Sequence, residues 1–148
     1  MNRNGDMNKI ILYSNYKKYG KEFPKVKGNI LKTLKILKKD DLKAEIFFVS
    51  EREIFNLNKQ YRKKNKATNV LSFENLPGFI EPKGKQTLLG EIYLCPDYIN
   101  QKGQNMSALA IHGLLHLLGF DHIKREERQI MEAKEKGLFT KLKISFFV

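Results

Sequence analysis

The sequence predicts an α+β fold in a single domain, with helices packed on a small mixed β-sheet of about four strands. Three observations support this prediction. The chain has 148 residues, a usual length for one compact domain. Its hydrophobic periodicity predicts elements in the order β-α-β-α-β-β-α-α, without internal repeats. Hydrophobic residues make up 41% of the chain and charged residues 30%, which is enough apolar material for a core and too much for a disordered chain.

The first half of the chain predicts two strands and two helices. A β-prone run at residues 9–13 predicts the first strand. A helix follows from Pro24, because apolar residues then recur at helical spacing while lysines occupy the other face. Residues 44–49 predict the second strand. Ser50 and Glu53 have the spacing of a capping box, which indicates that the second helix begins there.

The second half of the chain predicts two further strands and a series of helices. The strands are expected at residues 68–73 and 88–94. Residues 75–87 between them contain two prolines and two glycines, which is typical of a mobile loop. The helices that follow are expected from Pro96 to about Gly103, at 107–118 and at 124–138.

Cysteine usage and the apolar stretches predict the cellular compartment. Cys95 is the only cysteine, which excludes a disulfide-stapled secreted module. The strongly apolar stretch at residues 111–120 contains two histidines and is shorter than the ~20 apolar residues that span a bilayer. The first residues do not resemble a signal peptide. We therefore expect a soluble protein of a reducing compartment, with no membrane partner.

The positive charge is concentrated in the first half of the chain. The sequence has 28 Lys and Arg against 16 Asp and Glu, a net charge of +12. Residues 1–66 carry +11 of this charge and residues 67–148 carry +1. A one-sided basic field attracts polyanions, of which nucleic acid is the commonest. Alternatively, the lysines serve solubility or stability at high temperature, and an anionic membrane surface is a weaker option.

All three histidines lie within the string HGLLHLLGFDH. His112 and His116 are four residues apart, so on a helix they share one face. Gly119 can end that helix in a left-handed turn, after which His122 can approach the same ion from a loop. Three imidazoles would leave one coordination position open, as in a catalytic zinc site at the end of the late helix. The alternative is that these histidines only pack or hydrogen-bond within a buried helix.

The histidine spacing is similar to the zinc-peptidase pattern H-E-x-x-H-x-x-G-x-x-H, with one departure. The general base of that pattern is a glutamate after the first histidine, and Gly113 stands at that place. A peptidase without this carboxylate has no evident group to deprotonate its water. Asp121 is a substitute base or an orienting residue, or it caps the next helix turn. Cys95 could be a fourth ligand, but it ends a strand and fits better as a small buried residue.

Together with other segments, the histidine string resembles the YbeY family of bacterial metal-dependent endoribonucleases. The other segments are residues 57–74, residues 88–96 and Met131 with Glu135, and the resemblance runs from about residue 8 to residue 138. It implies a single YbeY-like metallohydrolase domain over residues 1–148 that cleaves single-stranded RNA. It also implies action in the cytoplasm on the 3′ end of small-subunit ribosomal RNA and in ribosome quality control, with the ribosomal subunit as partner.

The resemblance also assigns roles to residues. It implies that His112, His116 and His122 hold one zinc ion, although all-imidazole sites accept other divalent transition metals as well. It implies that Arg62 is functionally critical. Three neutral imidazoles leave the ion its full 2+ charge, and the planar fork of Arg62 matches two phosphate oxygens. The expected catalytic residues are Arg62, His112, His116 and Asp121.

Two other functions stay open beside the zinc-dependent endoribonuclease. One is a metallopeptidase-like hydrolase, and the other is a non-catalytic, zinc-stabilised protein that binds RNA or the ribosome. Tyr61, Phe73 and Phe79 could stack on RNA bases or could belong to the core. Because the basic half of the chain carries Arg62, we expect a basic groove that leads RNA toward the histidines. Lysines facing away from the histidines would instead indicate a role of the charge in solubility or stability.

Overall fold

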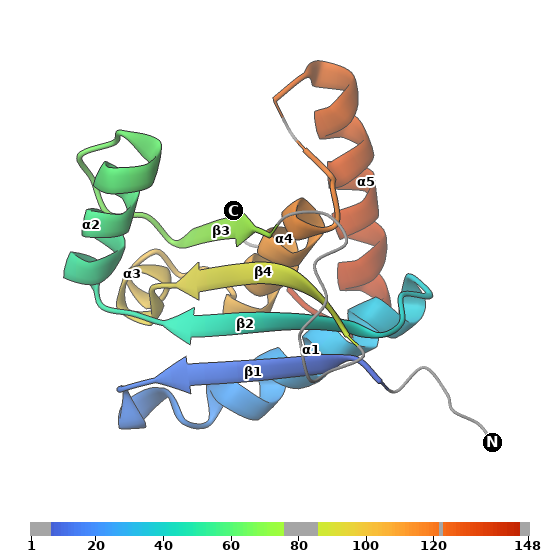
Figure 1. Ribbon diagram of the computed structural model, residues 1–148, viewed down its shortest axis with the longest axis horizontal. Coiled ribbons are helices and arrows are strands. Elements are labelled where there is room, and N and C mark those ends of the chain that lie inside the picture. The colour runs from blue at the N-terminus through green and yellow to red at the C-terminus, as the bar shows by residue number, and fades with distance from the viewer. Residues whose placement is uncertain (1–6, 76–85, 122, 146–148) are drawn as a thin grey trace.

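The computed structural model of the protein describes residues 7–75, 86–121 and 123–145, and the strands of this part form one mixed sheet (Figure 1). The strands are β1 (Lys9–Ser14), β2 (Leu42–Phe48), β3 (Val70–Glu74) and β4 (Thr87–Leu94). They lie in the order β1-β2-β4-β3. β1, β2 and β4 run parallel, and β3 pairs antiparallel with β4. The predicted α+β class and the mixed four-stranded sheet are confirmed.

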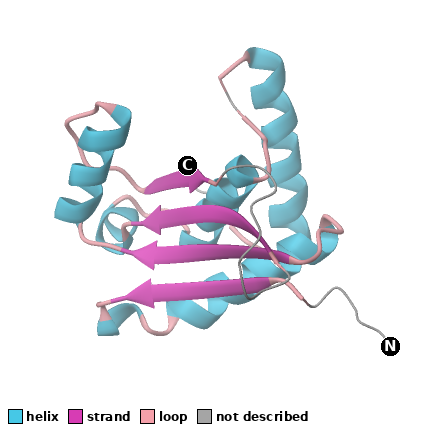
Figure 2. Cartoon of the chain, viewed as in Figure 1, coloured by secondary structure: helices cyan, strands magenta, loops and turns pink. Residues whose placement is uncertain are grey.

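Within the same described residues, five α-helices and one short 3-10 helix accompany the sheet (Figure 2). The α-helices are α1 (Glu22–Ile36), α2 (Glu51–Arg62), α3 (Pro96–Gln101), α4 (Met106–Leu117) and α5 (Arg125–Leu142). The 3-10 helix at Lys17–Tyr19 is not among the predicted elements. The prediction ended α5 at residue 138, but Leu138 and Phe139 are buried and the helix continues to Leu142. Residues 76–85, most of the predicted loop, lie outside the described residues.

Local sequence signals account for both ends of α2 and for the start of α4, the helices that carry Arg62 and the histidines His112 and His116. The Ser50 side chain accepts from the backbone N–H of Glu53, and Glu53 accepts from Ser50, so the predicted capping box begins α2. α2 ends where Lys63 adopts a left-handed conformation with φ 61°. The side chain of Asn105 accepts from the backbone N–H of Ala108 and caps the start of α4.

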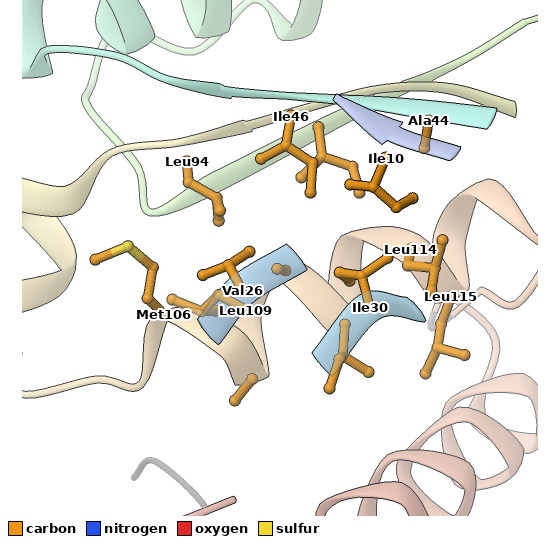
Figure 3. Close-up of a cluster of buried hydrophobic side chains, with 14 of the residues drawn as sticks. Ile10, Val26, Ile30, Ala44, Ile46, Leu94, Met106, Leu109, Leu114 and Leu115 are labelled. Atoms are coloured by element: carbon orange, nitrogen blue, oxygen red, sulfur yellow. The ribbon is translucent and has the colours of Figure 1, made fainter. Parts of the chain in front are cut away.

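The main core lies between the sheet and the helix pair α1 and α4 (Figure 3). Parallel neighbouring strands need a crossover, and α1 makes the crossover between β1 and β2. Ile46 and Leu94 project from the sheet toward this pair, where Val26 of α1 and Leu109 of α4 meet them (Figure 3). α5 contacts both α1 and α4, and it lies on the far side of these helices from the sheet. Helix α4 is thus covered from several sides.

Burial along α4 singles out its two histidines. Ten of its twelve residues are buried, and the two that are not are His112 and His116. The helix approaches the sheet closely at Gly113, where a Cβ atom would lie 3.1 Å from Ile92 Cγ2 and 3.4 Å from Val70 Cγ2. An apolar helix that is enclosed in this way gains most of its stability from packing. Its partly exposed polar side chains are therefore candidates for function.

A second, smaller core cluster contains the only cysteine of the chain. Cys95 is fully buried there together with Val49, Ile54 and Leu71. Burial raises the pKa of the Cys95 thiol. Cys95 lines neither of the pockets that contain a histidine. These observations agree with the interpretation of Cys95 as a small buried residue.

Candidate metal centre and phosphate-binding groove

The two histidines of α4 point their ring nitrogens at each other near the end of the helix. Their spacing of four residues places them on one face, and their Nε2 atoms lie 3.3 Å apart. Both residues are partly exposed, in contrast to the rest of α4. The other nitrogen of His112, Nδ1, lies 2.6 Å from Glu135 Oε2 on α5. Because an ionised carboxylate can only accept, Nδ1 donates this hydrogen bond, and a neutral His112 ring then has its lone pair on Nε2.

The distance between the two Nε2 atoms fits a tetrahedral zinc ion. With Zn–N bonds of ~2.0–2.1 Å, two imidazole ligands of one tetrahedral ion have nitrogen atoms roughly 3.3–3.4 Å apart. The measured distance between His112 and His116 is 3.3 Å. Within residues 7–75, 86–121 and 123–145, no group of three or more His, Cys, Asp or Glu side chains could hold a metal ion. The third expected ligand, His122, lies outside the described residues, so the three-histidine set stays a prediction.

The predicted turn after α4 is present. Gly119 has a φ of 103°, a conformation that is strained for residues with a side chain, and its N–H donates to the carbonyl oxygen of His116 at 3.0 Å. The N–H of Phe120 donates to the carbonyl oxygen of Leu115 at 3.0 Å. Through this turn Asp121 comes to line the same two pockets as His116. The turn therefore brings a carboxylate back toward the histidines.

Arg62 is the last residue of α2, and its side chain extends over β3. Its Nη2 donates to the carbonyl oxygen of Ser72 at 2.7 Å, and the guanidinium carbon lies 4.9 Å from the centre of the Phe73 ring. Ser72 thus contributes its backbone carbonyl to the site. These two contacts hold a cation that is otherwise exposed to solvent.

Two adjoining pockets bring the predicted site residues together, and we call them the Arg62–His116 groove. Arg62, Ser72, His116 and Asp121 line both pockets. The smaller pocket has a volume of about 170 Å³ and also includes Glu74 and Phe120; the larger one, about 560 Å³, also includes Lys64, Asn69, His112 and Ile123. Residues from α2, β3, α4 and the turn after α4 therefore converge in one place.

The expected basic groove is only partly present. Among the described residues, the cations that line the Arg62–His116 groove are Arg62 and Lys64, and two acidic residues, Glu74 and Asp121, line it as well. Lysines of α1 line a different pocket, which includes residues at the start of α4. The histidines lie toward the other end of that helix. Because α1 packs beside the buried start of α4, none of its described residues lines the Arg62–His116 groove.

The aromatic residues named from the sequence divide between surface and core. Tyr61 is 55% exposed, and its ring packs edge-to-face on Phe73 at 5.3 Å. Phe73 is half-buried and packs against the smaller core cluster. Phe79 lies outside the described residues. Tyr61 is therefore accessible beside Arg62, whereas Phe73 serves as the surface on which Arg62 rests.

Sequence reasoning missed Glu135 as a member of the site. Glu135 belongs to one of the segments that resemble the YbeY family, but the resemblance assigned no role to it. The signal available in the sequence was weak, because Glu135 shares a helix face with the apolar Met131 and Leu138, both buried in the structure. A carboxylate within an apolar stripe indicates a buried partner, but the stripe does not say which one.

Comparison with known proteins identifies the family. The family model described as Endoribonuclease YbeY matches residues 8–143. The chain belongs to the YbeY family of endoribonucleases. Endoribonuclease YbeY of Legionella pneumophila (strain Corby) is 38% identical over 135 residues, covering 83% of this chain and 84% of its own length. Endoribonuclease YbeY of Desulforamulus reducens is 34% identical over 142 residues, covering 81% of this chain and 91% of its own length.

A solved structure supports the same fold. The solution structure of a Thermotoga maritima protein superposes with a TM-score of 0.53 at 24% identity, and the match covers 90% of this chain and 91% of that one. The family model and the curated relatives confirm the resemblance to the YbeY family that the histidine string predicts. In addition, none of the helices in the described part of the chain is long and apolar enough to cross a lipid bilayer.

Proposed function

We propose that this chain is a metal-dependent endoribonuclease that cleaves single-stranded RNA in the Arg62–His116 groove. The observation that carries the proposal is the convergence of Arg62 with His116 and Asp121 in both pockets. A fork-shaped cation beside a pair of metal-binding imidazoles suits a phosphodiester, because both groups act on phosphoryl oxygens. Membership of a family named for endoribonuclease activity supports RNA as the substrate.

Arg62 would bind and orient the scissile phosphate. Its guanidinium keeps its charge at all physiological pH values and offers paired N–H donors to two phosphate oxygens. The hydrogen bond to the Ser72 carbonyl uses Nη2, and the Phe73 ring supports one face of the guanidinium plane. The remaining donors of the fork are therefore available to a substrate in a fixed orientation. This preorganisation stabilises the charge that develops in the transition state.

The proposed metal would be held by His112 and His116, with His122 as the expected third ligand. When bound, a zinc ion polarises a phosphoryl oxygen and lowers the pKa of water toward ~7. Among the described residues, two cations and two acidic residues line the groove, so this part of the lining offers an RNA phosphate little net attraction. Asp121 is one of these acidic residues. It would either orient a group at the reacting centre or accept a proton there as a general base. The proposed site thus relies on both Arg62 and the divalent ion for its positive charge.

The groove is suited to unpaired nucleotides. Sequence-specific RNA recognition mostly uses single strands, whose unstacked bases can be splayed out and stacked on aromatic side chains. Phe120 lines the smaller pocket, and Tyr61 is exposed next to Arg62. Each offers an aromatic surface near the phosphate position. We propose that these rings support bases on either side of the scissile bond.

The position of Gly113 argues against a peptidase. In the zinc-peptidase pattern this position holds the catalytic glutamate, which must reach the metal. Here residue 113 faces the sheet, and its Cβ would already lie 3.1 Å from Ile92 Cγ2. Gly113 also lines the larger pocket, so a glutamate there would be crowded by the sheet at the edge of the groove. The helix is therefore unsuited to the peptidase mechanism by packing as well as by sequence.

The finer biological role rests on family membership. We propose that the substrate is ribosomal RNA, with cleavage near the 3′ end of the small-subunit molecule and a part in ribosome quality control. The location would be the cytoplasm, where ribosomal subunits are the partners.

A cleavage assay with Arg62→Ala tests the proposal. Purified wild type is incubated with labelled single-stranded RNA, with the matching duplex and with casein. We expect cleavage of the single strand only, and a loss of at least about 100-fold in Arg62→Ala, the scale of one lost oxyanion-type donor. Arg52→Ala removes the same charge from an exposed position of α2 and should retain activity. Casein cleavage, or Arg62→Ala activity equal to that of Arg52→Ala, would overturn the proposal.

A further inference from the structure

Glu135 differs from the other glutamates of α5 in its environment. The helix contains four glutamates, and the other three are exposed. The side chain of Glu135 is only 15% exposed, and its Oε2 lies 2.6 Å from His112 Nδ1. Met131 and Leu138 stand on the same helix face and are buried. The face of α5 that packs on the rest of the protein therefore carries one carboxylate among apolar side chains.

The hydrogen bond fixes which nitrogen of His112 can bind a metal. A neutral imidazole carries one proton, on either Nδ1 or Nε2, and only the other nitrogen has a lone pair. The carboxylate of Glu135 accepts from Nδ1, which leaves the lone pair on Nε2. Nε2 is also the atom that faces His116 at 3.3 Å. Without an acceptor at Nδ1, the ring is free to carry its proton on Nε2 and to rotate.

We propose that Glu135 is a positioning residue for the metal centre: it holds His112 with its Nε2 lone pair directed at the metal position beside His116. This inference rests on the metal site of the proposed function. The two histidines belong to α4, whereas Glu135 belongs to α5. The inference therefore gives α5 a part in the metal centre, although its glutamate is not itself an expected metal ligand. A carboxylate bonded to the distal nitrogen of a histidine ligand also raises the basicity of that ligand.

Zinc affinity measured with Glu135→Gln tests the proposal. Glutamine has nearly the same shape but no charge, and Glu132→Gln makes the same change at an exposed position of α5. Affinity is measured by competition with a chromophoric chelator, and thermal unfolding of the metal-free proteins checks that both variants fold. We expect Glu135→Gln to bind zinc about 10- to 100-fold more weakly than wild type. Glu132→Gln should bind within about twofold of wild type, since it touches no ligand.

The tautomer of His112 gives an independent measurement on the metal-free protein. Long-range proton–nitrogen NMR distinguishes a protonated Nδ1 from a protonated Nε2. We expect wild type and Glu132→Gln to hold the proton of His112 on Nδ1, and Glu135→Gln to show a mixture of both forms. Glu135→Asp keeps the charge with a shorter reach, so it should fall between wild type and Glu135→Gln in both measurements.

The outcomes separate this inference from the proposed function. Wild-type zinc affinity in Glu135→Gln, or an unchanged Nδ1–H tautomer, would overturn the positioning role while leaving the metal site intact. A wild type that binds no zinc at the histidines would overturn both. Weaker zinc binding together with the tautomer change, at unchanged thermal stability, is the result that supports the positioning role.

Discussion

His112 and His116 lie edge-to-face on one side of α4, with ring centroids 4.8 Å apart and an angle of 79° between the ring planes. Two rings in this arrangement present their Nε2 atoms to a shared point without stacking on each other. The rest of α4 is buried, so the helix is held in place by the core while these two side chains reach the groove. The same packing that stabilises the fold therefore fixes the geometry of the candidate metal centre.

The Phe73 ring should contribute to RNA cleavage through Arg62. The guanidinium lies 4.9 Å from the ring centre, and a contact of this kind at an exposed site is worth ~0.5–1 kcal/mol. We expect Phe73→Leu to reduce kcat/KM for single-stranded RNA by roughly two- to fivefold, because Arg62 loses part of its support. The measurement is steady-state cleavage of a labelled oligonucleotide.

Tyr13→Leu provides the control for this prediction. Tyr13 stacks on Phe47 in the same sheet and is 42% exposed, and its strand β1 lies at the opposite edge of the sheet from β3. Its replacement should leave cleavage unchanged. Equal losses in both variants would attribute the effect to the sheet as a whole and refute a specific role of Phe73.

Gly113 should be intolerant of a side chain because α4 approaches the sheet there. A Cβ atom would lie 3.1 Å from Ile92 Cγ2. Overpacking costs ~1–3 kcal/mol, and the higher helix propensity of alanine offsets up to ~1 kcal/mol of it. We expect Gly113→Ala to lower the free energy of unfolding by roughly 1–2 kcal/mol in urea. Gly113→Glu, which restores the peptidase pattern, should unfold the protein and should not create peptidase activity.

A glycine on the neighbouring helix serves as the comparison. At Gly28 of α1 a Cβ atom would meet nothing within 4 Å. Gly28→Ala should therefore stabilise the protein by about 0.5–1 kcal/mol, since alanine loses less backbone entropy on folding. If both substitutions had the same sign, the close approach of α4 to the sheet would not explain the cost at Gly113.

Asp97 should make the stability of the fold depend on acid. The hydroxyl of Tyr19 donates to Asp97 Oδ1 at 2.5 Å and Lys18 Nζ lies 3.2 Å away, and these partners hold the pKa of Asp97 below its usual value. A folded-state pKa below the unfolded one favours the ionised carboxylate in the folded protein. The resulting stability is present above the unfolded pKa of ~3.9 and is lost as the pH falls through the folded pKa.

Urea unfolding from about pH 7 down to about pH 3 measures this contribution. We expect Asp97→Asn to be less stable than wild type at neutral pH and to lose less stability over the acidic part of the range. Asp40→Asn changes an exposed aspartate and should follow the wild-type curve. An Asp97→Asn curve parallel to that of wild type at every pH would contradict the assignment.

Local signals in the sequence account for much of the fold. The capping box at Ser50 and Glu53 placed the start of α2, and the period of four between His112 and His116 placed both on one face. Gly119 marked the turn because few other residues adopt its backbone conformation without strain. These predictions succeed because each depends on neighbours within one helical turn.

Features that depend on the packing of distant segments were harder to predict from the sequence. Arg62 precedes His116 by more than fifty residues, and their meeting depends on β3 pairing beside β4, which local periodicity does not encode. The partnership of His112 with Glu135 depends on how α5 crosses α4. The sequence gives the net charge of the first 66 residues but not the surface of the fold on which it lies. The position of the α1 lysines relative to the groove could therefore not be predicted.

RNA cleavage by zinc-depleted protein tests whether a metal bound at His112 and His116 is required for activity. Wild type and His116→Ala are stripped with a chelator, transferred to metal-free buffer and assayed on single-stranded RNA before and after one equivalent of zinc is added. The metal-dependent mechanism predicts that wild type is inactive when stripped and regains activity with zinc, whereas His116→Ala stays inactive in both states. Full activity of stripped wild type, or restoration of His116→Ala by zinc to the wild-type rate, would contradict it.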